Sequence, residues 1–292
     1  MKSSAPGREA RAVLAEQTLE IIDRGAYTNA QGKTVTIRDE VEAAKRDSWL
    51  YRPAQLPTIR EEAERLLLAE QTDATVDAPI IEVTEESTLE AARRLTGKQG
   101  LRDTLCLNFA SAKNPGGGFM GGSQAQEESL ARSSALYPCI AQMEEMYAHN
   151  RQLRTCLYSD YMIYSPKVPV FRDDRGLLLA EPYEVSIITA PAVNAGVVRE
   201  REPHNIASIA PVMLDRIRYL LAVAGTRRER AIVLGAYGCG VFRNNPADVA
   251  AMFRQVLIEE QYRLLFDHVT FAIFDRSADQ QVLHAFKAQF ER

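Results

Sequence analysis

From residue 79 onward, short apolar runs with strand character alternate with amphipathic stretches of helical period. Strand-like runs are expected at 79–83, 104–109, 161–165, 168–171, 183–189, 231–234 and 268–274. The stretch 206–221 keeps apolar residues at i, i+3, i+4 and i+7 throughout, which predicts the strongest helix. The run 231–234 is uninterrupted, as expected when helices cover both faces of a sheet. This alternation predicts an α/β fold with a mixed or parallel sheet layered between helices.

The first 75 residues follow a different pattern, in which charged, helix-like stretches replace the strand–helix alternation. These stretches cover residues 8–24, 38–46 and 59–70. Trp49, the only tryptophan in the chain, lies between the second and third stretches, where a large aromatic ring would pin this arm to the rest of the protein. We therefore expect an N-terminal helical extension at residues 1–75 and a layered α/β domain at residues 76–292.

Charge and hydropathy exclude several classes of function. The net charge is −4 and the pI is about 5.7, so no broad basic field is present and sequence-specific nucleic-acid binding is not expected. No apolar run approaches the ~18 residues needed to span a bilayer, and the segment Met1 to Gly7 lacks the apolar core of a secretory signal. We expect a cytoplasmic protein without a membrane partner.

The cysteines and histidines give no sign of a metal site. The four cysteines form no CxxC pair, and the four histidines form no HExxH motif or Cys/His cluster. We expect reduced thiols, no metal and no cofactor. Cys239 lies in a glycine-rich loop, but no histidine adjacent in sequence would activate it as a nucleophile, and a small packing residue is the expected role.

The most informative segment is the loop that follows the predicted strand at 104–109. It contains five glycines within seven residues, namely Gly116, Gly117, Gly118, Gly121 and Gly122. Ordering a glycine triplet is entropically unfavourable, which indicates that its backbone must approach something closely. Backbone amides beside a helix N-terminus suit an anionic ligand. The P-loop motif GxxxxGK[ST] does not occur here, because no Lys-Ser or Lys-Thr follows the glycines, and no GxGxxG opens a helix with an acid about 20 residues further on.

Two acidic residues follow the glycines at the start of a predicted helix. Ser123 and Gln126 have the spacing of a capping box, so we expect the helix to begin near Gln124. Glu127 and Glu128 would then point roughly 100° apart and face different parts of one ligand. This disfavours a glycosidase with two carboxylates flanking one bond. Acids are also common at helix N-termini for reasons of stability alone, but the adjacent glycines favour a functional role.

A second glycine-rich loop follows the predicted strand at 231–234. Gly235, Gly238 and Gly240 permit tight backbone turns beside an anion. The alternative is a plain connection to the helix that Asn245 and Pro246 are expected to start. Ser277 is likewise expected to cap the last helix. Ligands bind where parallel strands end and loops diverge, so both glycine loops are expected at one site.

The triplet Gly116–Gly118, followed after seven residues by Gln126-Glu127-Glu128, resembles the signature of bacterial-type poly(ADP-ribose) glycohydrolases. The second glycine loop is also similar to that family. The resemblance implies a macrodomain-like three-layer fold, with a mixed sheet between helices and a short N-terminal helical extension. It further implies a metal-free hydrolase that cleaves ribose–ribose O-glycosidic bonds in poly(ADP-ribose) and releases ADP-ribose.

The same resemblance implies roles for individual residues. Glu128 would be the catalytic acid/base, protonating the leaving 2′-oxygen and then activating water, and Glu127 would hold hydroxyls of the ribose being cleaved. The first glycine loop would approach the diphosphate and that ribose, amides of the second loop would bind the diphosphate, and Phe242 would pack against the terminal ribose. The expected substrate-binding set is Gly116, Gly117, Gly118, Asn108, Asn114, Gln126, Gly238, Gly240, Val241 and Phe242.

Alternative functions remain open at the level of the sequence. A non-catalytic ADP-ribose-binding macrodomain would share the fold but would not need both glutamates. A hydrolase that removes single ADP-ribose groups from proteins would share the ligand. A structural α/β protein would use the glycines only as turns, which five glycines in seven residues disfavour. The expected partners are poly(ADP-ribose), ADP-ribose and ADP-ribosylated proteins, and the expected state is a monomer.

Overall fold

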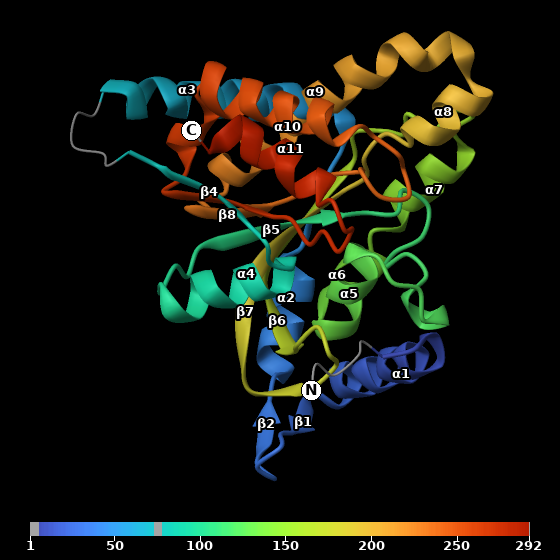
Figure 1. Cartoon of the computed structure of the whole chain (residues 1–292). Helices are drawn as coiled ribbons and strands as arrows, with labels where there is room; N and C mark the ends of the chain where they lie inside the picture. Colours follow the sequence, from blue (N-terminus) through green and yellow to red (C-terminus); the bar gives the residue numbers. More distant parts are fainter. Residues whose placement is uncertain (1–5, 73–77, 292) are drawn as a thin grey trace.

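The computed structural model describes residues 6–72 and 78–291, which are built around a seven-stranded mixed sheet (Figure 1). In spatial order, the strands are β3 (Trp49–Tyr51), β6 (Met162–Arg172), β7 (Leu178–Ala190), β5 (Thr104–Phe109), β8 (Ala231–Leu234), β9 (His268–Ala272) and β4 (Ile80–Thr84). The run from β7 to β4 is parallel, whereas β3, β6 and β7 pair antiparallel. The expected α/β fold with a mixed sheet is confirmed.

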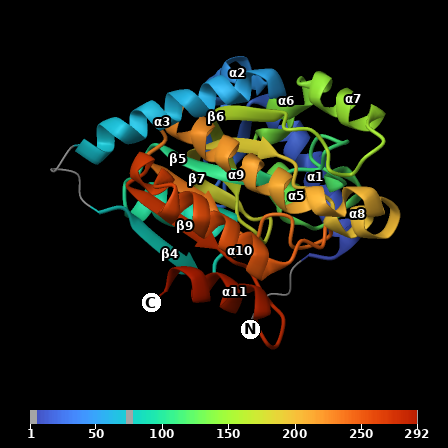
Figure 2. The same ribbon diagram turned by 90° about the horizontal axis from the view of Figure 1, so that it is seen from above.

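Helices cover both faces of this sheet (Figures 1 and 2). One face carries α3 (Leu56–Thr72), α9 (Ile209–Thr226), α10 (Pro246–Arg254) and α11 (Gln281–Phe290). The other carries α2 (Arg38–Asp47), α4 (Thr88–Arg93), α5 (Gln126–Ser133) and α6 (Leu136–Ala141). The remaining helices and the small hairpin are α1 (Arg8–Arg24), α7 (Glu144–Gln152), α8 (Ala195–Arg201), β1 (Ala26–Thr28) and β2 (Thr34–Thr36). Among the described residues, none of these helices has the length and apolarity needed to cross a bilayer.

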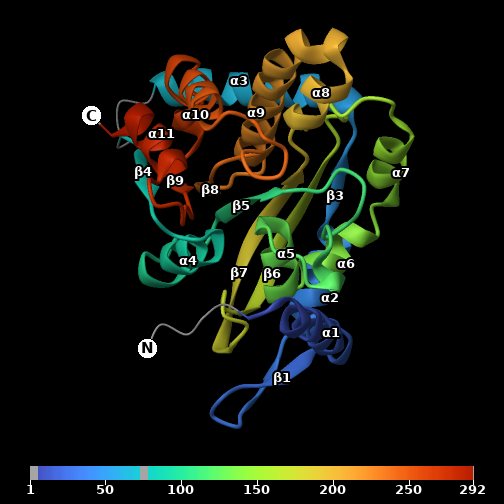
Figure 3. The same cartoon turned by 45° about the vertical axis from the view of Figure 1, so that its right-hand side comes forward.

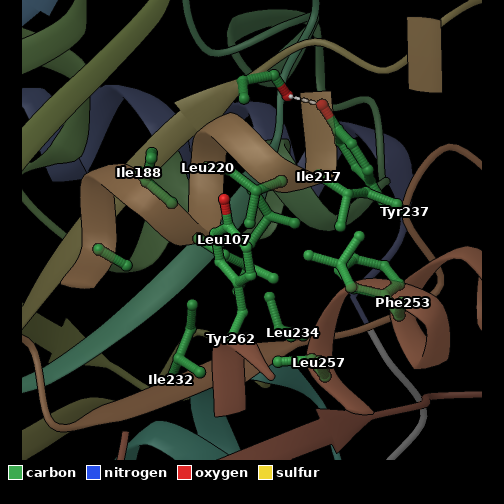
Figure 4. Close-up of a cluster of buried hydrophobic side chains, with 14 of the residues drawn as sticks. Leu107, Ile188, Ile217, Leu220, Ile232, Leu234, Tyr237, Phe253, Leu257 and Tyr262 are labelled. Carbon is green, nitrogen blue, oxygen red and sulfur yellow. Dashed lines mark hydrogen bonds between the residues drawn. The ribbon is translucent and has the colours of Figure 1, made fainter. Parts of the chain in front are cut away.

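Strand β8 is apolar at every position because each face of the sheet has its own core. Successive side chains of a strand point to opposite faces. Leu107 and Leu234 therefore pack among α9 and α10 (Figure 4), whereas Cys106 and Val233 join the core on the side of α4 and α6. The uninterrupted apolar run at 231–234 is thus explained by burial on both sides.

Several expected element boundaries are corrected by longer-range contacts. The runs 161–165 and 168–171 form one strand, β6, with an irregularity between Ser165 and Val168. Asn245 caps α10 as predicted, accepting a hydrogen bond from the Ala247 amide at 2.9 Å. The prediction that Ser277 caps the last helix is wrong. The carboxylate of Asp275 accepts the amide of Val282 instead, and the Ser277 hydroxyl donates to Asp275.

The N-terminal part contributes directly to the main sheet. Strand β3 pairs with β6 at the sheet edge, and α3 packs against α9. The side chain of Trp49 is 52% exposed, so the expectation that it pins this part by burial is wrong. Tyr51 takes that role, being buried with its hydroxyl bound to Arg227. Residues 73–77, where the proposed boundary at 75/76 falls, lie outside the described residues, and the division into two parts stays a prediction.

Candidate active site

Three loops meet at the carboxyl edge of the parallel strands. They follow the adjacent strands β7, β5 and β8, and the loops after β5 and β8 are the two glycine-rich ones. The rings of Phe109, at the end of β5, and Tyr237, just after β8, lie 5.9 Å apart between centroids. The structure therefore brings the two glycine loops to neighbouring positions, as expected from the rule that parallel strands open their loops at one edge.

The first glycine loop is a series of tight turns. The amide of Gly117 donates to the Asn114 carbonyl at 3.0 Å, and the amide of Ser123 donates to the Gly118 carbonyl at 3.2 Å. The φ angles at Gly116 and Gly117 are +70° and +58°, a backbone region that favours glycine. The path of the chain thus requires glycine at positions 116 and 117. Asn114 is exposed and contributes its carbonyl to the turn.

Glu128 is held against this loop through both carboxylate oxygens. Oε1 accepts the Gly118 amide at 3.0 Å, and Oε2 accepts the Ala125 amide at 2.8 Å. The second bond makes Glu128 the third residue of a capping arrangement whose N-cap is Ala125. The predicted capping box of Ser123 and Gln126 is therefore wrong, and α5 begins two residues later than expected. The capping contact aims the Glu128 carboxylate at the triplet.

Gly117 lies directly across both acidic side chains. A Cβ atom added there would lie 2.5 Å from Glu128 Oε1 and 3.2 Å from Glu127 Oε2. These separations leave no room for a side chain. The backbone of one glycine therefore contacts two carboxylates that leave the helix in different directions, which is the arrangement that the 100° spacing of adjacent helical residues produces.

Glu127 is the buried member of the pair. Its Oε2 accepts the Ser111 amide at 2.7 Å, and its Oε1 accepts Nδ2 of Asn108 at 3.3 Å. Burial raises the pKa of Glu127 to about 8, the Glu128 charge adds to this rise, and the hydrogen bonds from Ser111 and Asn108 oppose it. At neutral pH Glu127 is thus mostly protonated, which limits repulsion between the two acids.

Asn108 connects Glu127 to the neighbouring strand. Its Nδ2 also donates to the hydroxyl of Thr189 at the end of β7, at 3.1 Å. Its Oδ1 is buried and has no hydrogen-bond partner among the described residues. Buried acceptors are normally satisfied, so this oxygen is a candidate acceptor for a ligand hydroxyl.

Gln126 faces strand β5 rather than the glycine loop. Its Oε1 accepts the Phe109 amide at 2.8 Å, and its Nε2 donates to the Leu107 carbonyl at 2.7 Å. The side-chain amide of Gln126 therefore bonds to the backbone of β5 in the way that a neighbouring strand would. This contact fixes the start of α5, and with it the two glutamates, on the end of the strand.

The second glycine loop is closed by Asn244, which the sequence did not single out. Its Nδ2 donates to the carbonyls of Val193 at 2.8 Å and Gly238 at 3.0 Å. Gly238 has a φ of +72°, and a Cβ there would lie 2.6 Å from that of Ala192. These contacts hold the second glycine loop against the segment that follows β7. Burial raises the pKa of the Cys239 thiol to about 12, in line with a packing role for that residue.

The far side of the second loop is open. Gly240 has no atom within 4 Å of a potential Cβ position, and Val241 is 81% exposed. The ring of Phe242 is half-buried and lies 5.9 Å from that of Tyr158. Tyr158 belongs to an irregular segment between α7 and β6, and no motif in the sequence marks it. Its φ of +58° is imposed by the tertiary structure.

One protein family and several solved structures are similar to this chain. The family description "Microbial-type PARG, catalytic domain" matches residues 15–173, where PARG denotes poly(ADP-ribose) glycohydrolase. No curated protein matches the chain. Among solved structures, poly(ADP-ribose) glycohydrolase from Thermomonospora curvata is similar with a TM-score of 0.88 and 44% identity, over 97% of this chain and 100% of the other.

Two ligand-bound structures are also similar. The Thermomonospora curvata enzyme bound to the inhibitor ADP-HPD has a TM-score of 0.85 and 42% identity, with 97% of this chain and 100% of that chain covered. Poly(ADP-ribose) glycohydrolase from Deinococcus radiodurans in complex with ADP-ribose has a TM-score of 0.79 and 45% identity, with 86% and 97% covered. The family match and the three solved structures therefore agree with the fold.

Proposed function

The chain belongs to the microbial-type poly(ADP-ribose) glycohydrolase family, and on that premise we propose that it hydrolyses ribose–ribose O-glycosidic bonds in poly(ADP-ribose) and releases ADP-ribose. The observation that carries the proposal is the position of Glu128. Its two oxygens accept amides from Gly118 and Ala125, so one carboxylate is fixed at the glycine loop. A single positioned carboxylate is what general acid–base hydrolysis requires.

The ligand is proposed to be the ADP-ribose unit at the end of the polymer. The Deinococcus radiodurans relative binds ADP-ribose, and the glycine loops here have the backbone character that suits a diphosphate. We assign the diphosphate to the amides of Gly238, Gly240 and Val241, and we place the backbone of Gly116–Gly118 beside the diphosphate and the ribose, because the amides of Gly117 and Gly118 already donate within the protein. The open surroundings of Gly240 and the exposure of Val241 support this assignment. Phe242 packs against the terminal ribose.

Glu128 acts first as acid and then as base. It gives its proton to the 2′-oxygen of the leaving ribose as the bond from that oxygen to the anomeric carbon breaks. The resulting carboxylate accepts a proton from a water molecule, whose oxygen forms the new bond to the anomeric carbon. The cycle returns Glu128 to its protonated form, and no external reactant besides water is consumed.

Glu127 and Asn108 orient the ribose that is cleaved. Glu127 is buried and mostly protonated at neutral pH, so it donates a hydrogen bond to a ribose hydroxyl as well as accepting one. The unpartnered Oδ1 of Asn108 supplies a second acceptor. Both side chains are fixed by contacts that precede ligand binding, which limits the entropy lost when the ribose is bound.

The glutamate pair favours this function over a non-catalytic ADP-ribose reader. An ADP-ribose reader requires the glycine loops but no carboxylate at the triplet. A hydrolase of single ADP-ribose groups on proteins would use the same loops, so poly(ADP-ribose) and mono-ADP-ribosylated protein are both needed as test substrates. The proposed partners are poly(ADP-ribose), ADP-ribose and ADP-ribosylated proteins.

The test compares wild type with Glu128→Gln, measuring free ADP-ribose released from each substrate. We expect release from the polymer by the wild type alone and retained ADP-ribose binding by the variant. Glu90→Gln is a matched control, because Glu90 caps α4 through the Ser87 amide in the same way but lies outside the glycine loops. Wild-type protein that releases no ADP-ribose from the polymer would refute the proposal, as would full activity of Glu128→Gln.

A further inference from the structure

Three consecutive carbonyls after the glycine triplet are each held by an arginine. Arg8 Nε donates to the Gly121 carbonyl at 3.0 Å, and Arg11 Nε donates to the Gly122 carbonyl at 2.8 Å. Arg132 Nη1 donates to the Ser123 carbonyl at 2.6 Å. The first two arginines come from α1 and the third from α5, so two helices hold one short segment of the first glycine loop.

This contact reaches Glu128 through the backbone. The carbonyl and the amide of a trans peptide point in opposite directions. While the Gly122 carbonyl faces Arg11, the Ser123 amide of the same peptide donates to the Gly118 carbonyl at 3.2 Å. The amide of Gly118 in turn donates to Glu128 Oε1 at 3.0 Å. The carbonyl and the amide of Gly118 belong to two peptide units that meet at its Cα atom, so Arg11 acts on Glu128 through the position of the Gly118 backbone.

Helix α1 lies against both the loop and α5 (Figure 3). Ala15 of α1 packs with Phe119 of the loop and Ala131 of α5. The hydroxyl of Thr18 donates to the Arg132 carbonyl at 2.6 Å. The fit is tight at Gly122, where an added Cβ would overlap the carbonyl oxygen of Arg8. The helix is thus seated on the same two elements that define the position of Glu128.

Hydrogen bonds to carbonyls, rather than salt bridges, hold the arginines of this contact. Among the described residues, Arg8, Arg11 and Arg132 form no ion pair with a carboxylate. Burial and the neighbouring charge of Arg11 lower the pKa of Arg132 to about 10, and the charges of Glu128 and Asp174 oppose this fall. The three carbonyls stabilise the guanidinium groups through charge-assisted hydrogen bonds.

We propose that α1 holds the first glycine loop in place and that Arg11 is a positioning residue for Glu128. The inference rests on the proposed function, because it assigns Arg11 a role in the step that Glu128 performs. Arg11 also precedes residue 15, where the family match begins. Helix α1 therefore does more than add stability at the periphery, since it fixes the turn whose amide holds the catalytic carboxylate.

The test is a steady-state comparison of Arg11→Ala with Arg24→Ala, using poly(ADP-ribose) as substrate. Arg24 lies in the last turn of the same helix, and its exposed side chain makes no hydrogen bond or ion pair among the described residues. We expect kcat of Arg11→Ala to fall about tenfold with KM changed by less than about threefold, because misplacing a catalytic group lowers turnover more than binding. Arg24→Ala should match the wild type.

Rescue separates positioning from a merely structural role. Added methylguanidinium should restore part of the turnover of Arg11→Ala, and Arg11→Lys should retain more activity than Arg11→Ala. Equal kcat in Arg11→Ala and Arg24→Ala would overturn the inference. A loss of kcat in Arg11→Ala that neither lysine nor methylguanidinium relieves would also overturn it. Both outcomes leave wild-type hydrolysis intact, whereas the absence of wild-type hydrolysis would refute the proposed function itself.

Discussion

The Oε1 atom of Glu128 lies 3.0 Å from the amide nitrogen of Gly118, ten residues earlier in the chain. This bond joins the first turn of α5 to the glycine triplet, so the acidic group and the first glycine loop form one rigid unit. A carboxylate held in this way needs little reorganisation before it reacts.

Replacing Gly117 should disrupt the site more than its small size suggests. In Gly117→Ala the new methyl group would meet Glu128 Oε1 at 2.5 Å, and the φ of +58° disfavours alanine. We expect kcat/KM for poly(ADP-ribose) to fall about 100-fold, as a displacement of roughly 1 Å can produce. Gly97→Ala is the control, because Gly97 has open space and no positive φ. Equal activity of the two variants would contradict this account of the triplet.

Glu127→Gln should change how stability depends on pH. The folded-state pKa of about 8 lies above the ordinary value of 4.5, so the folded protein binds this proton more tightly than the unfolded chain. The associated stability is complete below about pH 4.5 and is lost as the pH rises towards 8. The glutamine of the variant does not titrate, so the variant does not lose stability in this way. The unfolding free energy of the variant minus that of the wild type should therefore increase between pH 5 and pH 8.5.

The shift in the pKa of Glu127 sets the size of this change in unfolding free energy. Each pKa unit corresponds to about 1.4 kcal/mol, so the difference between the two pH values should reach a few kcal/mol. Urea unfolding of both proteins at pH 5 and pH 8.5 measures it. A variant-to-wild-type difference that is the same at both pH values would show that Glu127 is not held in its neutral form.

Gln126→Met tests whether Gln126 positions the helix or contacts the substrate. Both ends of its amide are bound to the β5 backbone at Leu107 and Phe109. Methionine has a similar shape but leaves those buried groups unpaired, which should destabilise the protein by about 1–3 kcal/mol. We expect the melting temperature to fall while ADP-ribose affinity, measured by calorimetry, stays within about twofold. A large loss of affinity in a stable variant would instead indicate substrate contact.

Phe242→Ala should weaken ligand binding with little effect on the fold. The ring is half-buried in the second glycine loop, next to Tyr158, and is proposed to pack against the terminal ribose. Loss of that apolar contact should raise the Kd for ADP-ribose about tenfold. Leu68→Ala, at a residue of α3 that is 64% exposed, is the control. An unchanged Kd would remove Phe242 from the proposed site.

Local patterns predicted most of the elements. Helix α1, strands β5 and β8 and the Asn245 cap have the bounds or the role expected from period, apolar content and capping preference. The start of α5 was misplaced because Ser123 and Gln126 have the spacing of a capping box, while Glu128 is better placed to accept the Ala125 amide. Competition between two acceptors for one helix terminus depends on the loop geometry, which the spacing does not specify.

The strand–helix order, the two glycine loops and the two acids at the start of one helix could be predicted from the chain alone, because turns, caps and periodicity act over a few residues. The burial of Glu127, the approach of Glu128 to the loop, the positions of Asn244 and Tyr158 beside the second loop, and the bond from Arg11 to the Gly122 carbonyl all depend on how distant elements pack. That last contact joins residues 111 positions apart. Local patterns show which face of an element is buried, but they do not show which distant residue that face will meet.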